Sequence, residues 1–276
     1  MKTIAHISDL HFGTVNHNVA EGLIDDLHMI NPDLVINSGD FTQRARRSQY
    51  QAAAVYVKRL PNPRISVPGN HDVPLFDLFR RFLSPLKRYK EFICGDLLPS
   101  FVNDELTVIG INTARSLTWK NGRISIEQIR KVEKMFSELP DSHYRIVVTH
   151  HPFIPPPGVK NSGIALVGRA DLALEMLEKC RVDLLLAGHL HHGYTGDVRT
   201  FYPSSKRSII VAQAGTAISN RVRNETNSYN LIHLSKDRVE IIIRRWVPAE
   251  SHFTDTGKVA FKSVNGEWRS VVKDLG

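Results

Sequence analysis

Cysteine is scarce in this sequence, with only Cys94 and Cys180 among 276 residues. The two stand far apart and near no other metal-binding side chain, which excludes a disulfide framework and indicates a reducing compartment. The sequence also lacks any apolar run near the roughly 18 residues that span a bilayer. Its N-terminus enters a strand-like pattern at once and leaves no room for a signal peptide, so we expect a cytoplasmic protein.

Acidic residues are fewer than basic ones: 28 Asp and Glu stand against 36 Lys and Arg, giving a net charge of +8. This excess favours anionic partners, such as phosphorylated substrates, nucleic acid or an acidic membrane surface. Charge alone, however, favours the simpler explanation of a solvated basic surface. A hydrophobic fraction of 42% excludes a disordered or fibrous chain. Without repeats, low-complexity tracts or linkers, residues 1–276 are expected to form a single domain.

Hydrophobic periodicity predicts helices and buried strands that alternate through the first two-thirds of the chain. The expected helices cover 19–30, 48–60, 75–93 with a break at Pro85, 126–139 and 170–179. The expected strands cover 3–8, 33–37, 64–67, 106–111, 144–149 and 182–187. From about residue 205 the pattern becomes mainly β, with strands at 208–214, 229–234, 238–244, 258–263 and 266–271. The pair Asn265-Gly266 predicts a hairpin turn there.

Five of the expected strands end in side chains that bind metals or carry protons. In chain order these are Asp9 and His11, then Asp40, then Asn70, His71 and Asp72, then His150 and His151, and finally His189, His191 and His192. Ligands of open α/β sheets bind outside the carboxyl ends of the strands, so these five ends can converge on one site.

The donor types indicate a transition-metal site. Asp, Asn and His offer oxygen and imidazole nitrogen without sulfur, which suits Mn²⁺, Fe or Zn²⁺ better than Ca²⁺ or an iron–sulfur cluster. One metal could take Asp9, His11 and His191, a second Asn70, His150 and His189, and Asp40 would bridge them. Two metals about 3.5–4 Å apart suit phosphate ester hydrolysis, because they activate a water and clamp the phosphoryl oxygens.

At this point the sequence resembles a known family, the calcineurin-like metallophosphoesterases. Its five blocks are matched in order by Asp9-Leu10-His11, Gly39-Asp40, Gly69-Asn70-His71-Asp72, His150 and Gly188-His189-Leu190-His191, which span residues 9–191. The resemblance implies a four-layer α/β/β/α sandwich of two mixed sheets with a dinuclear metal centre. It also implies that His71 assists catalysis rather than binding metal, and that His150 rather than His151 is the ligand. Within the family, the compact form with the third block resembles class III cyclic-nucleotide and glycerophosphodiester phosphodiesterases.

The leading hypothesis is therefore a soluble hydrolase of small phosphodiesters that uses a metal-activated hydroxide. The alternative is a membrane-associated pyrophosphate hydrolase like the UDP-diacylglucosamine enzymes, but these usually carry Arg where this chain has His71. A nuclease would suit the positive charge, yet no added DNA-capping domain is visible in the sequence. A non-catalytic metal-bound scaffold is disfavoured because every ligand position is filled.

Three features could shape specificity. Arg115 follows a strand end and could reach a substrate phosphate, or simply lie on the surface. The proline-rich loop 152–158 could wall the pocket. The basic amphipathic segment 75–93 could lie on a membrane or cover a lipid tail, although packing of its apolar face on the protein's own sheet is favoured. The oligomeric state is left open.

Overall fold

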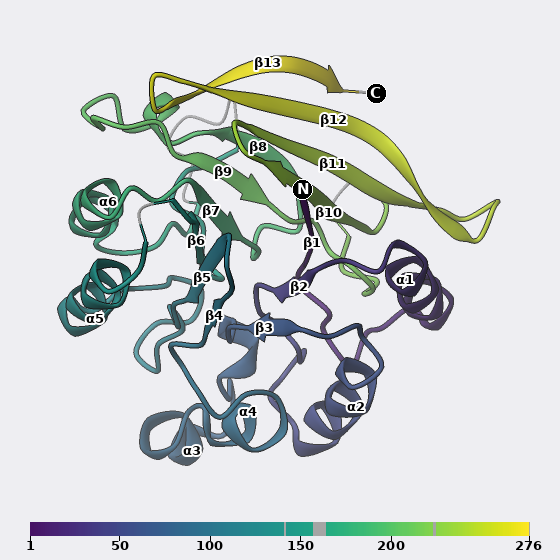
Figure 1. The fold of residues 1–276 in the computed structure, drawn as a ribbon. Helices are drawn as coiled ribbons and strands as arrows, with labels where there is room; N and C mark the ends of the chain where they lie inside the picture. The colour runs from purple at the N-terminus through teal and green to yellow at the C-terminus, as the bar shows by residue number, and fades with distance from the viewer. Residues whose placement is uncertain (141, 157–163, 223–224, 276) are drawn as a thin grey trace.

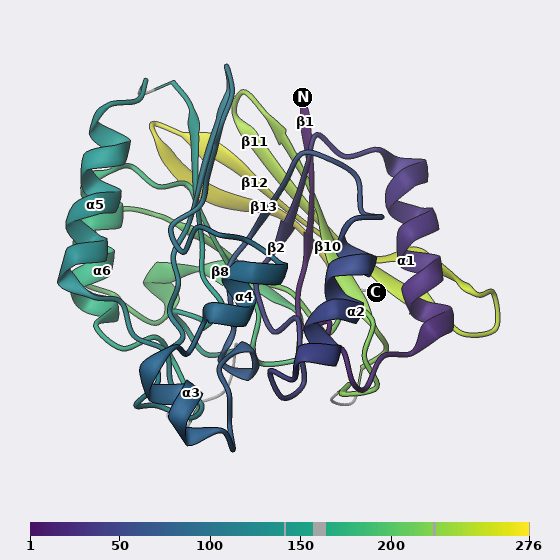
Figure 2. The same cartoon turned by 90° about the horizontal axis from the view of Figure 1, so that it is seen from below.

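The computed structural model describes residues 1–140, 142–156, 164–222 and 225–275. Two mixed β-sheets face each other, and helices cover their outer faces, as Figure 1 shows. Helices α1 and α2 lie outside one sheet, and α5 and α6 lie outside the other, which is clear again in the turned view of Figure 2. The expected four-layer α/β/β/α sandwich is thereby confirmed.

The first sheet has seven strands in the order β13-β12-β11-β10-β1-β2-β3. Its parallel half consists of β1 (Lys2–Ile7), β2 (Leu34–Asn37) and β3 (Arg64–Ser66), joined through α1 (His17–Ile30) and α2 (Arg47–Val57). Its antiparallel half consists of β10 (Ser228–Ser235), β11 (Arg238–Val247), β12 (His252–Val264) and β13 (Glu267–Leu275). Asn265 and Gly266 link the last two strands with φ values of 53° and 80°, so the predicted hairpin turn is confirmed.

The second sheet has six strands in the order β4-β5-β6-β7-β9-β8. They are β4 (Ser100–Val102), β5 (Leu106–Gly110), β6 (Tyr144–Val148), β7 (Leu184–Ala187), β8 (Tyr194–Asp197) and β9 (Ile210–Gln213). Its outer helices are α5 (Ile126–Ser137) and α6 (Ala170–Lys179). The short edge strands β4 and β8 were not expected from the sequence. Strand β9 pairs in parallel with β7, so it completes the α/β half instead of opening the β-rich part.

The inner faces of the two sheets share one apolar core. It includes Ile36 of the first sheet and Val148 and Leu186 of the second, all of them buried. One further apolar cluster lies between each sheet and its outer helices. Strands covered on both faces account for the continuous apolar runs in the sequence.

The segment 75–93 forms two short helices, α3 (Leu78–Leu83) and α4 (Lys87–Phe92), separated at Pro85 as predicted. The expectation that its apolar face packs on the protein's own sheet is wrong for α3. Phe79 is 75% and Leu83 is 68% exposed, whereas Arg81 is only 2% exposed. Hydrogen bonds from the Arg81 guanidinium to backbone carbonyls make the charged residue the inward one. Among the described residues, no helix combines the length and the apolar character that crossing a bilayer requires.

Candidate metal centre

Five parallel strands from the two sheets end at one place, and the side chains singled out in the sequence follow them. Asp9 and His11 come after β1, Asp40 after β2, Asn70 after β3, His150 after β6, and His189 and His191 after β7. Five of these residues have φ between 46° and 81°, a region that side chains other than glycine seldom adopt: Asp9, His11, Asp40, His189 and His191. Such strain concentrated at one place is typical of a functional site.

The first donor group comprises Asp9, His11 and His191, whose ligand atoms all lie within 4.8 Å of one another. Asp9 Oδ1 is 3.4 Å from His11 Nε2 and 3.7 Å from His191 Nε2. All three residues are buried, and the two imidazole rings stack with centroids 5.0 Å apart. The structure thus brings together the three residues that the sequence analysis assigned to one metal.

The second donor group comprises Asn70, His150 and His189. Asn70 Oδ1 is 3.2 Å from His150 Nε2 and 3.0 Å from His189 Nδ1, and these two nitrogens are 3.3 Å apart. Burial, helped by the neighbouring His150, lowers the pKa of His189 to about 3. His189 is therefore a neutral imidazole, the form that can bind a metal.

Asp40 lies between the two groups. Its Oδ2 atom is 3.7 Å from His11 Nε2 in the first group and 3.3 Å from His150 Nε2 in the second. Its other oxygen, Oδ1, accepts a hydrogen bond of 2.8 Å from the backbone N–H of His71. A hydrogen bond to Oδ1 thus fixes the orientation of the Asp40 carboxylate, and Oδ2 faces both donor groups.

The buried polar atoms at the centre fit a bound cation. Asp9 Oδ1, His11 Nε2 and Asp40 Oδ2 are buried and have no hydrogen-bond partner. Burying such atoms without partners is costly, and a cation would satisfy all of them. Burial alone would lower the pKa of His150, but Asp40, Asp9 and the Ser38 carbonyl together outweigh it and raise this pKa to about 9. The same negative field attracts a metal ion, and the oxygen and nitrogen donors suit a divalent transition metal.

Hydrogen bonds behind the donors fix their orientation. His150 Nδ1 donates to the carbonyl of Ser38 at 2.8 Å, which turns Nε2 toward the centre. His191 Nδ1 is 2.6 Å from Thr216 Oγ1. Asp9 Oδ2 accepts from the Ser8 hydroxyl at 2.6 Å. Such supporting contacts set the tautomer and the direction of metal-binding side chains.

The carboxylate of Asp72, the last residue of the third block, organises the loop around it. It accepts from the backbone N–H groups of Phe41, Thr42 and Gly69 at 3.0–3.1 Å. Burial raises the pKa of Asp72 to about 7, with Asp40 adding to the shift. Asp72 therefore positions its neighbours and takes no part in either donor group.

His71 lies beside the first donor group, with its ring centroid 4.9 Å from that of His11. Its Nδ1 is 2.9 Å from the carbonyl of Gln43, which can only accept, so Nδ1 carries the proton. Its Nε2 accepts from Arg221 Nη1 at 3.0 Å. Both ring nitrogens are thus engaged by a neutral imidazole, and burial lowers the pKa of His71.

Arg221 is a site residue that the sequence analysis missed. It belongs to the loop between β9 and β10, outside the five blocks, and besides His71 it contacts Gln43 Oε1 at 3.4 Å. No local motif marks it; the available signal was the pair of cations Arg221 and Arg223 in a polar stretch of sequence. It adds a hydrogen-bond donor at the edge of a centre that otherwise consists of acceptors.

Two neighbouring histidines lie outside both donor groups. His151 is buried behind His150, with its Nδ1 2.7 Å from Thr113 Oγ1. His192 pairs with Glu225 at 2.8 Å. Neither histidine belongs to a donor group, although the His151 ring packs against that of His189 with centroids 4.7 Å apart.

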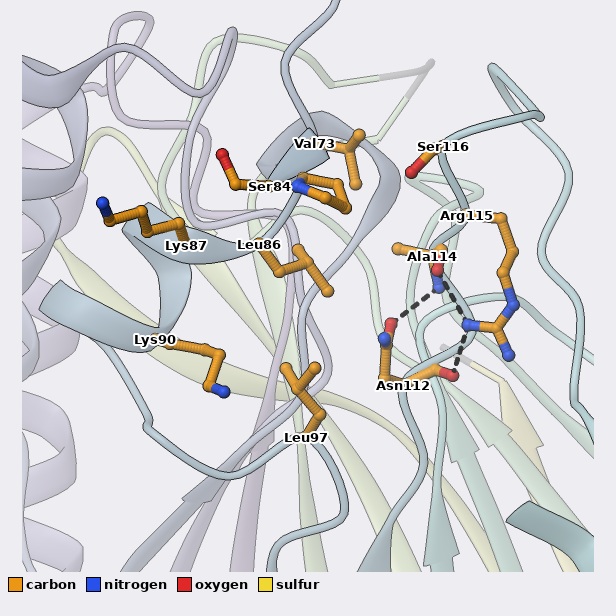
Figure 3. A pocket seen from close by; sticks show the side chains of 11 residues that line it. Val73, Ser84, Leu86, Lys87, Lys90, Leu97, Asn112, Ala114, Arg115 and Ser116 are labelled. Atoms are coloured by element: carbon orange, nitrogen blue, oxygen red, sulfur yellow. Dashed lines mark hydrogen bonds between the residues drawn. The ribbon is translucent and has the colours of Figure 1, made fainter. Parts of the chain in front are cut away.

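The other expected specificity features lie elsewhere. Arg115 donates to the carbonyls of Asn112 and Ala114 and to Gln128, at the side of a separate cavity of about 560 Å³ (Figure 3). In the proline-rich loop, Phe153 and Ile154 are buried in the core under the second sheet's helices. Residues 157 and 158 of that loop lie outside the described residues.

The family model described as calcineurin-like phosphoesterase matches residues 2–193. The chain belongs to this family. The resemblance seen in the five blocks is thereby confirmed, as is the expectation of a phosphoester hydrolase at the level of the family.

Two curated relatives and one solved structure extend this result. The chain is 25% identical over 205 residues, 70% of its own length and 74% of the other's, to a probable cyclic nucleotide phosphodiesterase of a Synechococcus strain. It is 32% identical over 165 residues to a probable glycerophosphodiester phosphodiesterase of Arcobacter nitrofigilis, spanning 58% of this chain and 57% of that protein. It shares its fold, at a TM-score of 0.65 and 13% identity, with a purple acid phosphatase from yellow lupin, over 98% of this chain and 57% of that one.

Proposed function

We propose that this chain is a dinuclear metal-dependent phosphodiesterase that hydrolyses small phosphodiesters of the cyclic-nucleotide or glycerophosphodiester type. The observation that carries the proposal is Asp40, whose Oδ2 faces two separate donor groups at once. A carboxylate in this position is what a two-metal site requires. The printed names of the relatives support the diester substrate class.

In this proposal Asp9, His11 and His191 hold one ion, Asn70, His150 and His189 hold the other, and Asp40 contacts both. Mn, Fe and Zn are the candidate metals, from the oxygen and nitrogen donors present. When bound, the two ions supply a hydroxide at neutral pH and positive charge for the phosphoryl oxygens.

Arg221 and His71 act beside the metals in this proposal. The Arg221 guanidinium presents charged donors suited to a phosphoryl oxygen of the diester. When the substrate takes up that guanidinium, the Nε2 atom of His71 loses its present partner. That nitrogen can then take up a proton from solvent and donate it to the departing alkoxide oxygen, which makes His71 the proposed general acid.

A hydrolysis panel on metal-loaded protein tests the proposal. We expect about two metals per chain by elemental analysis and faster cleavage of bis-p-nitrophenyl phosphate than of p-nitrophenyl phosphate. Cyclic AMP and glycerophosphodiesters then separate the two diester types. A strong preference for the monoester, or metal-free wild-type protein that stays folded after loading, would contradict the proposal. UDP-diacylglucosamine and single-stranded DNA in the same panel test the pyrophosphatase and nuclease alternatives.

A further inference from the structure

One part of the surface is unusually apolar. On and next to α3, five large apolar side chains are more than half exposed, and two more follow from the loop at 116–119. We call these seven residues the α3 surface: Phe76, Leu78, Phe79, Phe82, Leu83, Leu117 and Trp119. Their exposed fractions run from 55% for Phe82 to 84% for Leu117. Contiguous apolar exposure of this kind marks an interaction site.

The α3 surface is held in place by Arg81, which lies beneath it. The guanidinium of Arg81 donates to the carbonyls of Ser116 at 2.7 Å, Pro74 at 2.8 Å and Thr118 at 2.6 Å. It also lies 5.3 Å from the ring centroid of Trp119. Arg81 therefore ties the helix and the loop together. The apolar side chains cannot turn inward without breaking these contacts, so the surface is preformed.

Basic side chains lie close to the α3 surface, in contact with it or near it along the chain. Arg44 lies 5.5 Å from the ring of Phe76, and the exposed cations nearby in the sequence are Arg80, Lys87, Lys90 and Lys120. Asp77 within the segment is paired with Arg80 at 2.5 Å. Apolar side chains with cations close by fit the interface of an anionic bilayer, where rings enter the headgroup region and cations meet the lipid phosphates.

The same charges argue against a second copy of this chain as the occupant. A two-fold symmetric contact places the same patch on both partners. It would bring the basic side chains near the α3 surface of one copy against those of the other, in a chain whose net charge is already +8. An anionic lipid surface carries the opposite charge to these side chains, whereas a second copy carries the same charge and is repelled.

The α3 surface also adjoins the metal centre. The carbonyl of Trp119 accepts a hydrogen bond of 3.3 Å from Asn70 Nδ2, on a residue of the second donor group. We propose that the α3 surface docks the protein on anionic lipid bilayers, next to the metal centre. The consequence for catalysis, that diesters are hydrolysed beside a bilayer, rests on the proposed function; the docking itself does not.

Vesicle sedimentation tests the docking with the metal-loaded full chain. Wild type should bind phosphatidylcholine vesicles containing phosphatidylglycerol at least about tenfold better than phosphatidylcholine alone, and added salt should weaken binding. The double variant Phe79→Ser and Phe82→Ser should lose most of this binding. The matched control, Met29→Ser and Leu172→Ser, changes exposed apolar residues on α1 and α6 and should bind like wild type. Melting temperature and metal content check that each variant is folded.

Native tryptophan fluorescence tests the same contact without any substitution. Trp119 is 58% exposed on the α3 surface, whereas Trp246 and Trp268 are buried. Brominated acyl chains in the anionic vesicles should therefore quench Trp119 emission. Absence of wild-type binding, binding that survives the Phe79→Ser and Phe82→Ser changes, or a dimer that buries this surface in place of vesicles would each overturn the docking. Inactivity on bis-p-nitrophenyl phosphate would overturn only the proposed function.

Discussion

The metal centre and the α3 surface break the usual distribution of polar and apolar side chains in opposite ways. In the centre, the carboxylates of Asp9 and Asp40 and the imidazoles of His11 and His150 are buried, and several of their atoms lack partners. On α3, phenylalanines and leucines face solvent while an arginine is buried. Each arrangement is unfavourable alone and becomes favourable with a partner: a cation for the centre, a lipid surface for α3. Each departure from the usual rule, that polar side chains are exposed and apolar ones buried, therefore indicates the kind of partner.

In the metal centre, removing the carboxylate of Asp40 should have the largest effect on metal content and activity. Asp40→Ala is expected to lower metal content more than any other single ligand change, since Oδ2 faces both donor groups. The rate on bis-p-nitrophenyl phosphate should fall by about 10⁴-fold or more. Elemental analysis and steady-state kinetics measure both effects. Asp25→Ala, at an exposed position on α1, is the control and should retain metal and activity. Full metal occupancy in Asp40→Ala would refute its bridging role.

A second substitution separates chemistry from metal binding in the same centre. His71→Ala should keep about two metals and lose about 10²–10⁴ in kcat, because a general acid is removed and no ligand is lost. The defect should be smaller for p-nitrophenolate, a good leaving group, than for an alkoxide such as ribose. A variant that loses metal in step with activity would make His71 a ligand. Full activity on a natural diester would move the proton donor elsewhere.

The support behind the ligands predicts an intermediate effect. Thr216→Val removes the hydroxyl 2.6 Å from His191 Nδ1 while keeping the side chain's size. Loss of such a partner typically lowers metal affinity by about 10–100-fold. Competition with a chelator at graded concentrations measures the change. Thr195→Val, on the edge strand β8, provides the control. Equal chelator resistance in Thr216→Val and wild type would show that this contact is dispensable.

Arg221 should affect substrate binding more than metal binding. Arg221→Gln is expected to raise KM for a diester by about tenfold with metal content unchanged, because a charge-assisted contact to a phosphoryl oxygen is lost. Arg221→Lys should recover part of the loss. The exposed Arg130→Gln on α5 is the control. A fall in kcat alone, with KM constant, would instead assign Arg221 to the positioning of His71.

The metal-binding residues could be predicted from the sequence, whereas the residues that surround them could not, and the reason is physical. Asp9, Asp40 and His150 follow apolar runs within a few residues, and parallel strands bring their carboxyl ends to one edge, so local order predicts convergence. Arg221 and Thr216 reach the centre only because the loop after β9 folds back over it. Nothing in their neighbouring residues encodes that return.

The prediction for α3 was wrong for the opposite reason. Its sequence pattern was clear, but the pattern was assigned to the wrong packing. Apolar residues at helical spacing predict one buried face, but spacing cannot say which face is inside. The inward face is decided by backbone carbonyls that accept from Arg81, and two of the three, at residues 116 and 118, are distant along the chain. The break at Pro85, a local effect of one residue on backbone geometry, was predictable.

The smallest expected effect gives the sharpest test of the comparison, because it concerns stability and not activity. Phe79 is 75% exposed, so Phe79→Ser removes almost no buried contact, and the free energy of unfolding should change by no more than about 0.5 kcal/mol. Phe136 on α5 is fully buried, and Phe136→Ala should cost about 3–5 kcal/mol. Urea unfolding of both variants without lipid measures the contrast. If Phe79→Ser cost as much as Phe136→Ala, the α3 side chains would be part of the core in solution. The apolar surface would then serve folding and not an outside partner. A negligible cost is the result expected of a side chain that contributes to lipid contact and not to folding.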